Sequence, residues 1–502
     1  MEDILMKNIK KIISLLLIAA LTVICFTSCG KENKNKNIVI GTTYVVDKID
    51  PTDGGDPWSL TGNGISETIY TQDREGKLVS HLVKETERKD DHTWILTLKD
   101  AKFSDGSPVS AKAFSDCMND IMEHNELARA SAGKILFTPL DENKVKLETE
   151  RETNLLKPLL CEWTNVMYKR DGNKFIFTGP YKVKSLDPGV KMELEPNEYY
   201  DEHAKERKNI TIKAFKDENA MKQAFESGEI DMAFTVTPEI AKELKEEGKT
   251  VREFKAGYQY FAVTNGKKGV MKDVNVRKAL SNLINREDMI KALDGGSVAT
   301  GFFAHYYDFN GDLKIKEDKK EALDALKASG YTEKNGKIVN KDGKQLTIKM
   351  VTYPARPDLK LLMQQTASQL DKVGIKAETK LVENIDTYVE SGDYDIIFYA
   401  HHTAPTGDPG FALNLFFRTD GGKNTMGYSN PEVDAMLDKM GELPAGKERN
   451  ELAKNVQKIV SKEYPVILLI DPEWHIAVSE KLKNYEPYCG DYYVVNPELG
   501  LK

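Results

Sequence analysis

The sequence is poor in cysteine and histidine, the residues that most often mark metal centres, disulfide scaffolds and nucleophilic sites. The chain of 502 residues contains five cysteines and eight histidines. Cys25 and Cys29 lie in an apolar N-terminal stretch, which leaves Cys117, Cys161 and Cys489 without a CxxC spacing. Neither a zinc site nor a disulfide framework is therefore indicated. Cys117 and Cys161 form either one bridge or two buried thiols.

The common hydrolase motifs are missing as well. No HExxH, no GxSxG and no cysteine-nucleophile arrangement occurs in the sequence. Such motifs hold a zinc ion with its general base, or present a nucleophile on a tight turn. Their absence argues against a secreted hydrolase, and we expect neither an enzyme nor a bound cofactor.

An excess of basic residues is also absent. The chain carries 71 Lys and Arg against 79 Asp and Glu, which gives a formal net charge of -8. Charged residues make up 30% of the sequence and apolar residues 40%. This composition is typical of a soluble globular protein and gives no indication of nucleic-acid binding. A chain of this length usually folds into two or more domains or lobes.

One apolar run stands at the N-terminus. "MKNIKKIISLLLIAALTVICFTSCG" begins with lysines and continues with an apolar core of roughly 15 residues, which is short for a membrane span and suits a signal peptide. Glu2 and Asp3 precede this basic region, so translation begins at either Met1 or Met6, and Met6 is our hypothesis.

The run ends in "FTSCG", which resembles a bacterial lipobox with Cys29 as the lipidated residue. An ordinary cleaved signal with an incidental cysteine is the alternative. The following "GKENKNKN" is polar and aperiodic, as in a flexible tether. We predict a lipoprotein signal peptide over 1–28 and a lipidated cysteine with its tether over 29–37. The protein would be lipid-anchored on the extracytoplasmic face of the cell membrane.

From about residue 38, short β-like runs alternate with amphipathic helical segments. The apolar residues of "TWILTL" alternate as on a half-buried strand, and Ser110 is placed to cap a helix that begins at Ala111. "NITIKAFKDENAMKQAFESGEIDMAFTV" predicts a strand, a helix ended by Gly228, and a second strand. "KLLMQQTASQLDKVGIKAETKLV" followed by "YDIIFYA" repeats this order. These units predict an α/β fold with mixed sheets.

Four further stretches share a resemblance and occur in a fixed order along the chain. They read "LTLKDAKFSDGSPVSAKAF", "FTGPYKVKSLDPGVKMELEPNEYYDE", "DVNVRKALSNLINREDMI" and "GYSNPEVDAML". Together they resemble family 5 of the bacterial extracellular solute-binding proteins, the peptide- and nickel-binding components of ABC importers. The resemblance extends from about residue 40 to about residue 475, nearly the whole mature chain.

This resemblance implies a bilobal fold of the periplasmic-binding-protein type (type II, cluster C), with a hinge that the chain crosses twice. Lobe I would comprise 38–257 and the C-terminal return 470–502, and lobe II would comprise 258–469. We place the crossings near Gly257 and within 465–470. A small-molecule ligand would lie between the lobes, and lobe closure would be sensed by the ABC permease and its ATPase subunits.

The stretch "IIFYAHHTAPTGDPGF" is where lobe II of this family meets the cleft. In peptide-binding members an acidic residue shortly before "DP" receives the amino terminus of the peptide, and here Pro405 takes that place. Nickel-binding members resemble this loop more closely. Neutral imidazole suits nickel, copper and zinc. His401 and His402 would point to opposite faces of a strand, so only one would contact the ligand, and we favour His402 over His401. Ordinary strand-end packing is the alternative.

The other ligand-binding candidates are Arg356, Trp163 and Tyr44. Arg356 lies in "YPARPDL", where its guanidinium either grips a ligand carboxylate or is a surface group. Trp163 is either an aromatic wall for a chelate or a core residue, and Tyr44 would end the first strand at the ligand. Trp474 and His475, after the second crossing, are expected in the core.

The sequence thus predicts a lipid-anchored solute-binding protein of an ABC importer. Its ligand would be nickel or a related transition metal, carried as a small chelate with a molecule such as histidine. An oligopeptide- or dipeptide-binding protein is the alternative, and a sensory surface lipoprotein would share the same fold.

Overall fold

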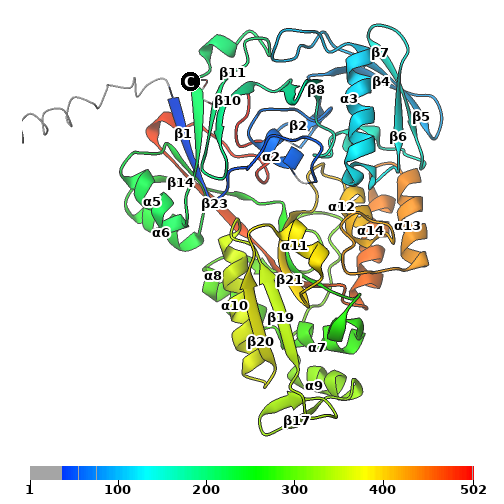
Figure 1. Cartoon of the computed structure of the whole chain (residues 1–502), viewed down its shortest axis with the longest axis vertical. Coiled ribbons are helices and arrows are strands. Elements are labelled where there is room, and N and C mark those ends of the chain that lie inside the picture. Colours follow the sequence, from blue (N-terminus) through cyan, green and yellow to red (C-terminus); the bar gives the residue numbers. More distant parts are fainter. Residues whose placement is uncertain (1–36, 55, 75, 500, 502) are drawn as a thin grey trace, which may run out of the picture.

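The computed structural model describes residues 37–54, 56–74, 76–499 and 501 (Figure 1). The expected signal peptide, Cys29 and nearly all of the tether lie outside the described residues. Within the described part of the chain, no helix is both long enough and apolar enough to cross a membrane.

Strands from both ends of the chain build one mixed sheet, the sheet of lobe I. Its order is β10-β11-β12-β1-β13-β23-β14. β1 pairs in parallel with β12 and β13, and the other neighbours are antiparallel. The strands are β1 (Asn37–Thr42), β10 (Tyr181–Asp187), β11 (Lys191–Pro196), β12 (Asn209–Ala214), β13 (Met232–Val236), β14 (Thr250–Lys255) and β23 (Glu473–Val478).

Strands from the middle of the chain build a second mixed sheet, the sheet of lobe II. Its order is β16-β22-β15-β21-β19-β20. The strands are β15 (Tyr258–Thr264), β16 (Ser297–Val298), β19 (Thr347–Thr352), β20 (Lys376–Leu381), β21 (Ile396–His402) and β22 (Val466–Asp471). In Figure 1 the two sheets occupy the upper and the lower part of the molecule, as the bilobal α/β prediction requires.

The chain passes between these sheets at Gly257 and again at Pro472. Gly257 separates β14 from β15 and has a positive φ of 68°. Asp471 still pairs with Ser297 in lobe II, and β23 begins at Glu473. The second crossing therefore lies just beyond the stretch 465–470 in which the sequence placed it, because the apolar β22 remains in its sheet to the last residue.

Smaller sheets and the helices complete both lobes. A four-stranded antiparallel sheet contains β4 (Val83–Arg88), β5 (Thr93–Leu98), β7 (Lys144–Thr149) and β6 (Ile135–Pro139), and three strand pairs are β2 (Thr71–Gln72) with β3 (Leu78–Val79), β8 (Tyr168–Asp171) with β9 (Lys174–Phe177), and β17 (Thr332–Lys334) with β18 (Lys337–Val339). The α-helices are α2 (Asp56–Gly62), α3 (Ala111–His124), α4 (Leu156–Leu160), α5 (Glu218–Glu226), α6 (Pro238–Glu246), α7 (Val274–Leu283), α8 (Arg286–Leu293), α9 (Lys319–Ala328), α10 (Pro357–Asp371), α11 (Ile385–Ser391), α12 (Gly410–Phe417), α13 (Pro431–Glu442) and α14 (Lys447–Ser461).

The local sequence predictions hold where they can be compared. Ser110 accepts a hydrogen bond from the amide of Ala113 and caps α3, as its position before the apolar segment predicted. The chain leaves α5 through Gly228, whose φ is 74°. Cys117 and Cys161 are both buried free thiols. Of the two alternatives, a disulfide bridge or two thiols, the structure therefore has two thiols.

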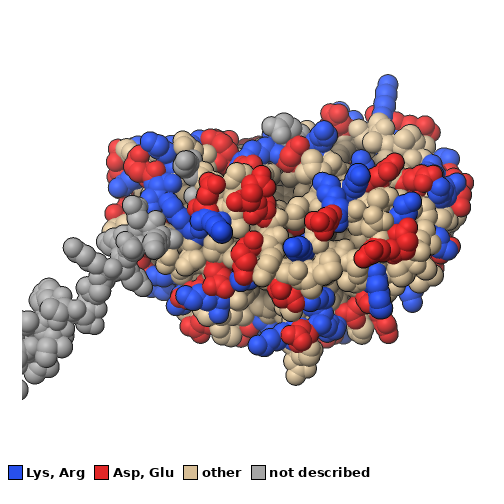
Figure 2. Space-filling view, turned by 90° about the horizontal axis from the view of Figure 1, so that it is seen from above, with Lys and Arg blue, Asp and Glu red and all other residues tan. Residues whose placement is uncertain are grey.

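Acidic and basic side chains are interspersed over the face of the molecule seen in Figure 2. This face shows no continuous basic area, in keeping with the net charge of -8. A surface of mixed sign keeps a protein soluble without creating a docking track for phosphate backbones.

Gly257 offers a first test of the hinge. A methyl group at this position would collide with the imidazole of His402 and would also have to adopt a left-handed backbone. We expect Gly257→Ala to lower the free energy of unfolding by about 3 kcal/mol, measured by urea denaturation. Gly330→Ala is the matched control, because Gly330 has a φ of 81° but no atom within 4 Å of the added carbon. Equal losses in the two variants would contradict the packing of His402 at the hinge.

Candidate ligand-binding site between the lobes

Strand β21 carries both histidines to the place where the lobes meet. The strand continues through His402, as predicted, so the two side chains point to opposite faces of the sheet. His401 lies against Tyr399 and Phe416, with its ring centroid 4.9 Å from that of Phe416. Its cross-strand partner on β15 is Gln259.

His402 occupies the hinge itself. Its ring lies 5.4 Å from that of Tyr258 and 4.9 Å from that of Tyr492, which belongs to the C-terminal return. Gly257 and Gly490 contact the imidazole so closely that neither has room for a side chain. The imidazole of His402 therefore packs between the first crossing and the C-terminal segment of lobe I.

Both imidazoles are neutral in the folded protein near pH 7. Burial lowers the pKa of His402 to about 4. Burial and the nearby ammonium of Lys423 hold the pKa of His401 well below its usual value. A neutral imidazole keeps a lone pair on one ring nitrogen, which is the form that binds metal ions.

Buried polar atoms without a hydrogen-bond partner gather in two short segments of the described chain. One segment is 401–403, with His401 Nε2, His402 Nδ1 and Thr403 Oγ1, and the other is 162–165, with Glu162 Oε2, Trp163 Nε1, Thr164 Oγ1 and Asn165 Oδ1. Each such atom costs about 1–3 kcal/mol unless a ligand or an ordered water satisfies it. The two segments are thus candidates for ligand or water contacts.

The segment 162–165 meets lobe II at Asp408 and at α12. The ring of Trp163 stands edge-on to that of Phe411, with centroids 6.1 Å apart. Burial, together with the negative charge of Asp408, raises the pKa of Glu162. Trp163 is itself buried, so it can be a core residue and a wall of the cleft at once.

Asp491 joins the lobes through three hydrogen bonds. Its carboxylate accepts from Arg356 Nη2 at 2.6 Å and from the Tyr258 hydroxyl at 2.9 Å, both in lobe II. It also accepts from the indole of Trp58, in lobe I, at 2.9 Å. Tyr44 stacks on Trp58 with ring centroids 6.1 Å apart and is 38% exposed.

Arg356 is largely enclosed and is not a surface group. Its side chain is 14% exposed, and its guanidinium lies 5.0 Å from the ring centroid of Trp474 and 4.8 Å from that of Tyr258. Among the described residues, only its Nη2 donates hydrogen bonds, to Asp491 and Tyr258. The other guanidinium donors are therefore available to a ligand.

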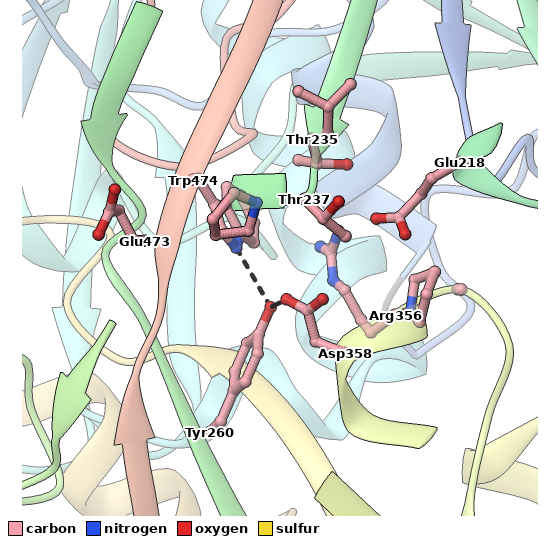
Figure 3. A pocket seen from close by; sticks show the side chains of 12 residues that line it. Glu218, Thr235, Thr237, Tyr260, Arg356, Asp358, Glu473 and Trp474 are labelled. Carbon is pink, nitrogen blue, oxygen red and sulfur yellow. Dashed lines mark hydrogen bonds between the residues drawn. The ribbon is translucent and has the colours of Figure 1, made fainter. Parts of the chain in front are cut away.

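A small cavity of about 20 Å³ lies beside Arg356 (Figure 3). Such a volume holds roughly one water-sized group. The lining comes from both lobes and includes Glu218, Thr235, Thr237, Tyr260, Arg356, Asp358, Glu473 and Trp474. A change in lobe separation would therefore alter its size directly.

The cavity is lined by the carboxyl groups of Glu218, Asp358 and Glu473 and by the guanidinium of Arg356. Burial raises the pKa of Glu218 to about 8, and the negative charges of Asp358 and Asp217 add to the effect. Asp358 accepts a hydrogen bond from the Tyr260 hydroxyl at 3.1 Å, and burial raises its pKa too. Glu218 forms no hydrogen bond or ion pair with the described residues, and its carboxylate faces the cavity in Figure 3.

Of the residues chosen from sequence, the structure links His402 and Arg356 through Tyr258. Tyr44 reaches the same group through Trp58 and Asp491. His401 and Trp163 pack elsewhere, against Phe416 and Phe411 of α12.

Sequence reasoning missed Asp491, Trp58, Glu218 and Asp358. The "YPARPDL" motif pointed to the neighbourhood of Asp358, but Asp491 and Trp58 stand in segments without a motif.

A cleft between two lobes on a twice-crossed hinge defines a solute-binding protein of the bilobal type. The profile described as "Bacterial extracellular solute-binding proteins, family 5 Middle" matches residues 77–424. The chain belongs to this family, which is a family of binding proteins and not of enzymes.

Relatives with known ligands include metal and peptide binders. The nickel-binding protein NikA of Staphylococcus aureus is 23% identical over 486 residues, covering 94% of this chain and 96% of NikA. The oligopeptide-binding protein AppA of Bacillus subtilis is 27% identical over 332 residues, covering 62% of this chain and 60% of AppA. The chain therefore resembles the nickel-binding relative over the greater part of its length.

The solved structures show that the fold is shared. NikA from Staphylococcus aureus in complex with Ni(L-His)2 has a TM-score of 0.83 at 23% identity, covering 92% of this chain and 99% of that chain. AppA from Bacillus subtilis with a nonapeptide has a TM-score of 0.78 at 19% identity, covering 91% of this chain and 97% of that chain.

The low pKa of His402 predicts acid sensitivity of the fold. Between pH 6.5 and about 4 the unfolded chain binds a proton at this position and the folded chain does not, so stability falls as the pH falls. The contribution of one such histidine is at most about 1.4 kcal/mol per pH unit. In His402→Gln, this part of the slope of unfolding free energy against pH is expected to disappear. His203→Gln, at an exposed histidine, is the control, and an unchanged slope in His402→Gln would contradict the prediction.

Asp491 provides a second test of the site. Asp491→Asn keeps the size of the side chain but leaves the enclosed guanidinium of Arg356 without its counter-charge. We expect the free energy of unfolding to fall by about 3 kcal/mol in urea titrations. Glu498→Gln breaks a comparable but exposed pair with Arg74, for which the expected loss is below about 1 kcal/mol. Similar losses in both variants would contradict the expected cost of leaving the enclosed guanidinium unpaired.

Proposed function

We propose that the chain is the solute-binding lipoprotein of an ABC importer and that it captures nickel, or a related transition metal, as a small chelate. The chelator would be an amino acid such as histidine. The ligand is held between the lobes, and the closed protein delivers it to the permease. No covalent chemistry is involved, and the metal is cargo.

The observation that carries this proposal is that the guanidinium of Arg356 has hydrogen-bond donors that bond to none of the described residues. It is fixed between the lobes by Asp491 and Tyr258, so little conformational freedom remains to be lost when a ligand binds. Its Nε and Nη1 have no partner in the described part of the chain, and each can donate a charge-assisted hydrogen bond to a carboxylate. An amino-acid chelate of a metal presents such a carboxylate.

The histidines and aromatic rings supply the rest of the proposed site. His401 and His402 are neutral at the pH of the cell exterior, so either can offer a ring nitrogen to the metal without first losing a proton. His401 Nε2 is the freer of the candidates, because His402 is packed between glycines at the hinge. Trp163 and Tyr44 would form walls of the cleft.

Glu218 could receive a cationic group of the ligand. It has no partner among the described residues, and burial together with the negative charge of Asp358 raises its pKa to about 8, so without a ligand its carboxyl group is largely protonated near pH 7. A positive charge beside it would favour the charged carboxylate. In an amino-acid chelate the metal ion supplies this charge, because the coordinated amino group is a neutral amine.

The carboxyl group of Glu218, unpaired among the described residues, also supports short peptides as the second candidate ligand. The position at which peptide-binding members carry an acid is Pro405, which cannot receive an amino terminus. Glu218 could do so in its place, and AppA shows that this fold accommodates a nonapeptide. Backbone hydrogen bonds would then supply most of the affinity.

Anchoring to the membrane belongs to the same proposal. Cys29 in "FTSCG" would carry the acyl chains and hold the protein on the extracytoplasmic face of the cell membrane. An anchored binding protein stays close to its permease, which raises the effective concentration of loaded protein there.

Calorimetric titration of the purified protein tests the ligand. The affinity for Ni2+ with excess L-histidine is expected to fall by at least about tenfold in Arg356→Met and in His401→Ala. Each substitution removes one polar contact with the chelate. Lys376→Met, which alters an exposed pair on β20, should bind as the parent protein does.

A mixture of di- to pentapeptides, titrated separately, decides between the two ligands. Binding of peptides, and none of nickel with histidine, would exclude the chelate and establish the peptide function. Unchanged chelate binding in both Arg356→Met and His401→Ala would show that the ligand lies elsewhere.

A further inference from the structure

A group with metal-binding chemistry lies on lobe I, next to the second crossing. Glu473 and His475 are two residues apart on β23 and so point to the same face. Glu253 on β14 is the direct cross-strand partner of His475. One ligand atom from each of the three residues lies within 4.8 Å of the others.

His475 distinguishes this group from an ordinary acidic patch. Its side chain is 4% exposed, and its Nε2 lies 3.1 Å from Glu473 Oε1. Within the described residues its buried Nδ1 has no hydrogen-bond partner. The sequence placed His475 in the core, and the structure buries it, but with its ring directed at a carboxylate.

The imidazole of His475 is already directed at a second ligand. Its Nε2 lies 3.1 Å from Glu473 Oε1, and with the proton on Nε2 the two atoms form a hydrogen bond. A metal ion bound here would take the place of that hydrogen, and the ring proton would then lie on Nδ1, which has no partner within the described residues.

The surroundings orient the carboxylate and leave the group net negative. The amide of Gly296, in lobe II, donates to Glu473 Oε2 at 3.4 Å, which leaves Oε1 for His475. In Figure 3 the carboxylate of Glu473 points away from Glu218 and Asp358. Lys245 contributes one nearby positive charge against the two carboxylates.

We propose that Glu253, Glu473 and His475 bind a divalent first-row transition-metal ion, such as nickel or zinc, at a site separate from the interlobe ligand. Imidazole and carboxylate are ligands that these ions accept, and exposed Glu253 leaves room for water at the remaining positions. The proposal does not depend on the identity of the transported solute.

The bound ion would act on the hinge. Glu473 directly follows Pro472, the second crossing, and β14 leads through Lys255 to Gly257, the first crossing. An ion that joins Glu253 to Glu473 and His475 ties the lobe I ends of both crossings together. The hinge becomes stiffer when the ion is bound.

Titration with NiCl2 alone, without a chelator, tests this site in the purified protein. Removal of even an outer-shell partner of a metal site costs about 10- to 100-fold in affinity, so loss of a ligand in Glu253→Gln should cost at least about tenfold. Glu253 is exposed, and this substitution should leave the fold intact. Glu246→Gln, at an exposed position on α6, is the matched control.

Cobalt(II) supplies the spectroscopic readout. Its visible absorption should change on binding to the parent protein and to Glu246→Gln, and should remain that of the aqueous ion in Glu253→Gln. Equal NiCl2 affinity in Glu253→Gln and Glu246→Gln would overturn the proposal, and so would a parent protein that leaves the cobalt spectrum unchanged.

His401→Ala separates this proposal from the transported ligand. It should retain the NiCl2 site while losing affinity for nickel with histidine. A protein that binds NiCl2 through Glu253 but binds no chelate would overturn the proposed cargo and leave the second site standing. Loss of NiCl2 binding in His401→Ala would overturn the second site.

Discussion

The carboxylate of Asp491 is the group through which the two lobes hold each other. It accepts hydrogen bonds from Trp58 in lobe I and from Tyr258 and Arg356 in lobe II. An enclosed ion pair adds little stability compared with well-packed apolar residues, but breaking it is expensive. Its effect is therefore to select one relative orientation of the lobes, and this orientation determines the shape of the cleft.

His402 extends the same constraint along the hinge. Its ring fills the space above Gly257 and Gly490, so the first crossing and the C-terminal return move as one packed unit. Glycine at 257 satisfies two demands at once, because its φ of 68° and the approach of the imidazole both exclude a side chain. The hinge is thus defined by packing as much as by backbone freedom.

The sequence was informative wherever a local rule decided the structure. Periodicity and capping predicted the strands around α5 and the start of α3, and the ordered motifs predicted the bilobal α/β fold. Alternation along β21 predicted that His401 and His402 face opposite ways. Apolar residues pack on both faces of this strand, so both imidazoles are buried. Ordinary packing at a strand end would have left one of them exposed to solvent.

Contacts between distant segments could not be read from the sequence. Asp491 meets Arg356 across 135 residues and Trp58 across 433 residues, and neither Asp491 nor Trp58 stands in a segment with a motif. Glu218 and Asp358 are each ordinary residues in the first turn of a helix, where carboxylates are common. Only the tertiary fold turns them into neighbours in a cavity.

The position of β23 has a consequence for the order in which the protein matures. This strand is made of residues 473–478 but lies between β13 and β14 in the interior of the lobe I sheet. Until the last part of the chain has been synthesised, β14 has no neighbour in that sheet. Arg356 also lacks its hydrogen-bond acceptor, the carboxylate of Asp491. Lobe II, whose strands all lie within 258–471, can assemble first. A chain that is still being made can therefore hold one finished lobe and one incomplete sheet, and the contact between the lobes through Asp491 forms only when the C-terminal segment arrives.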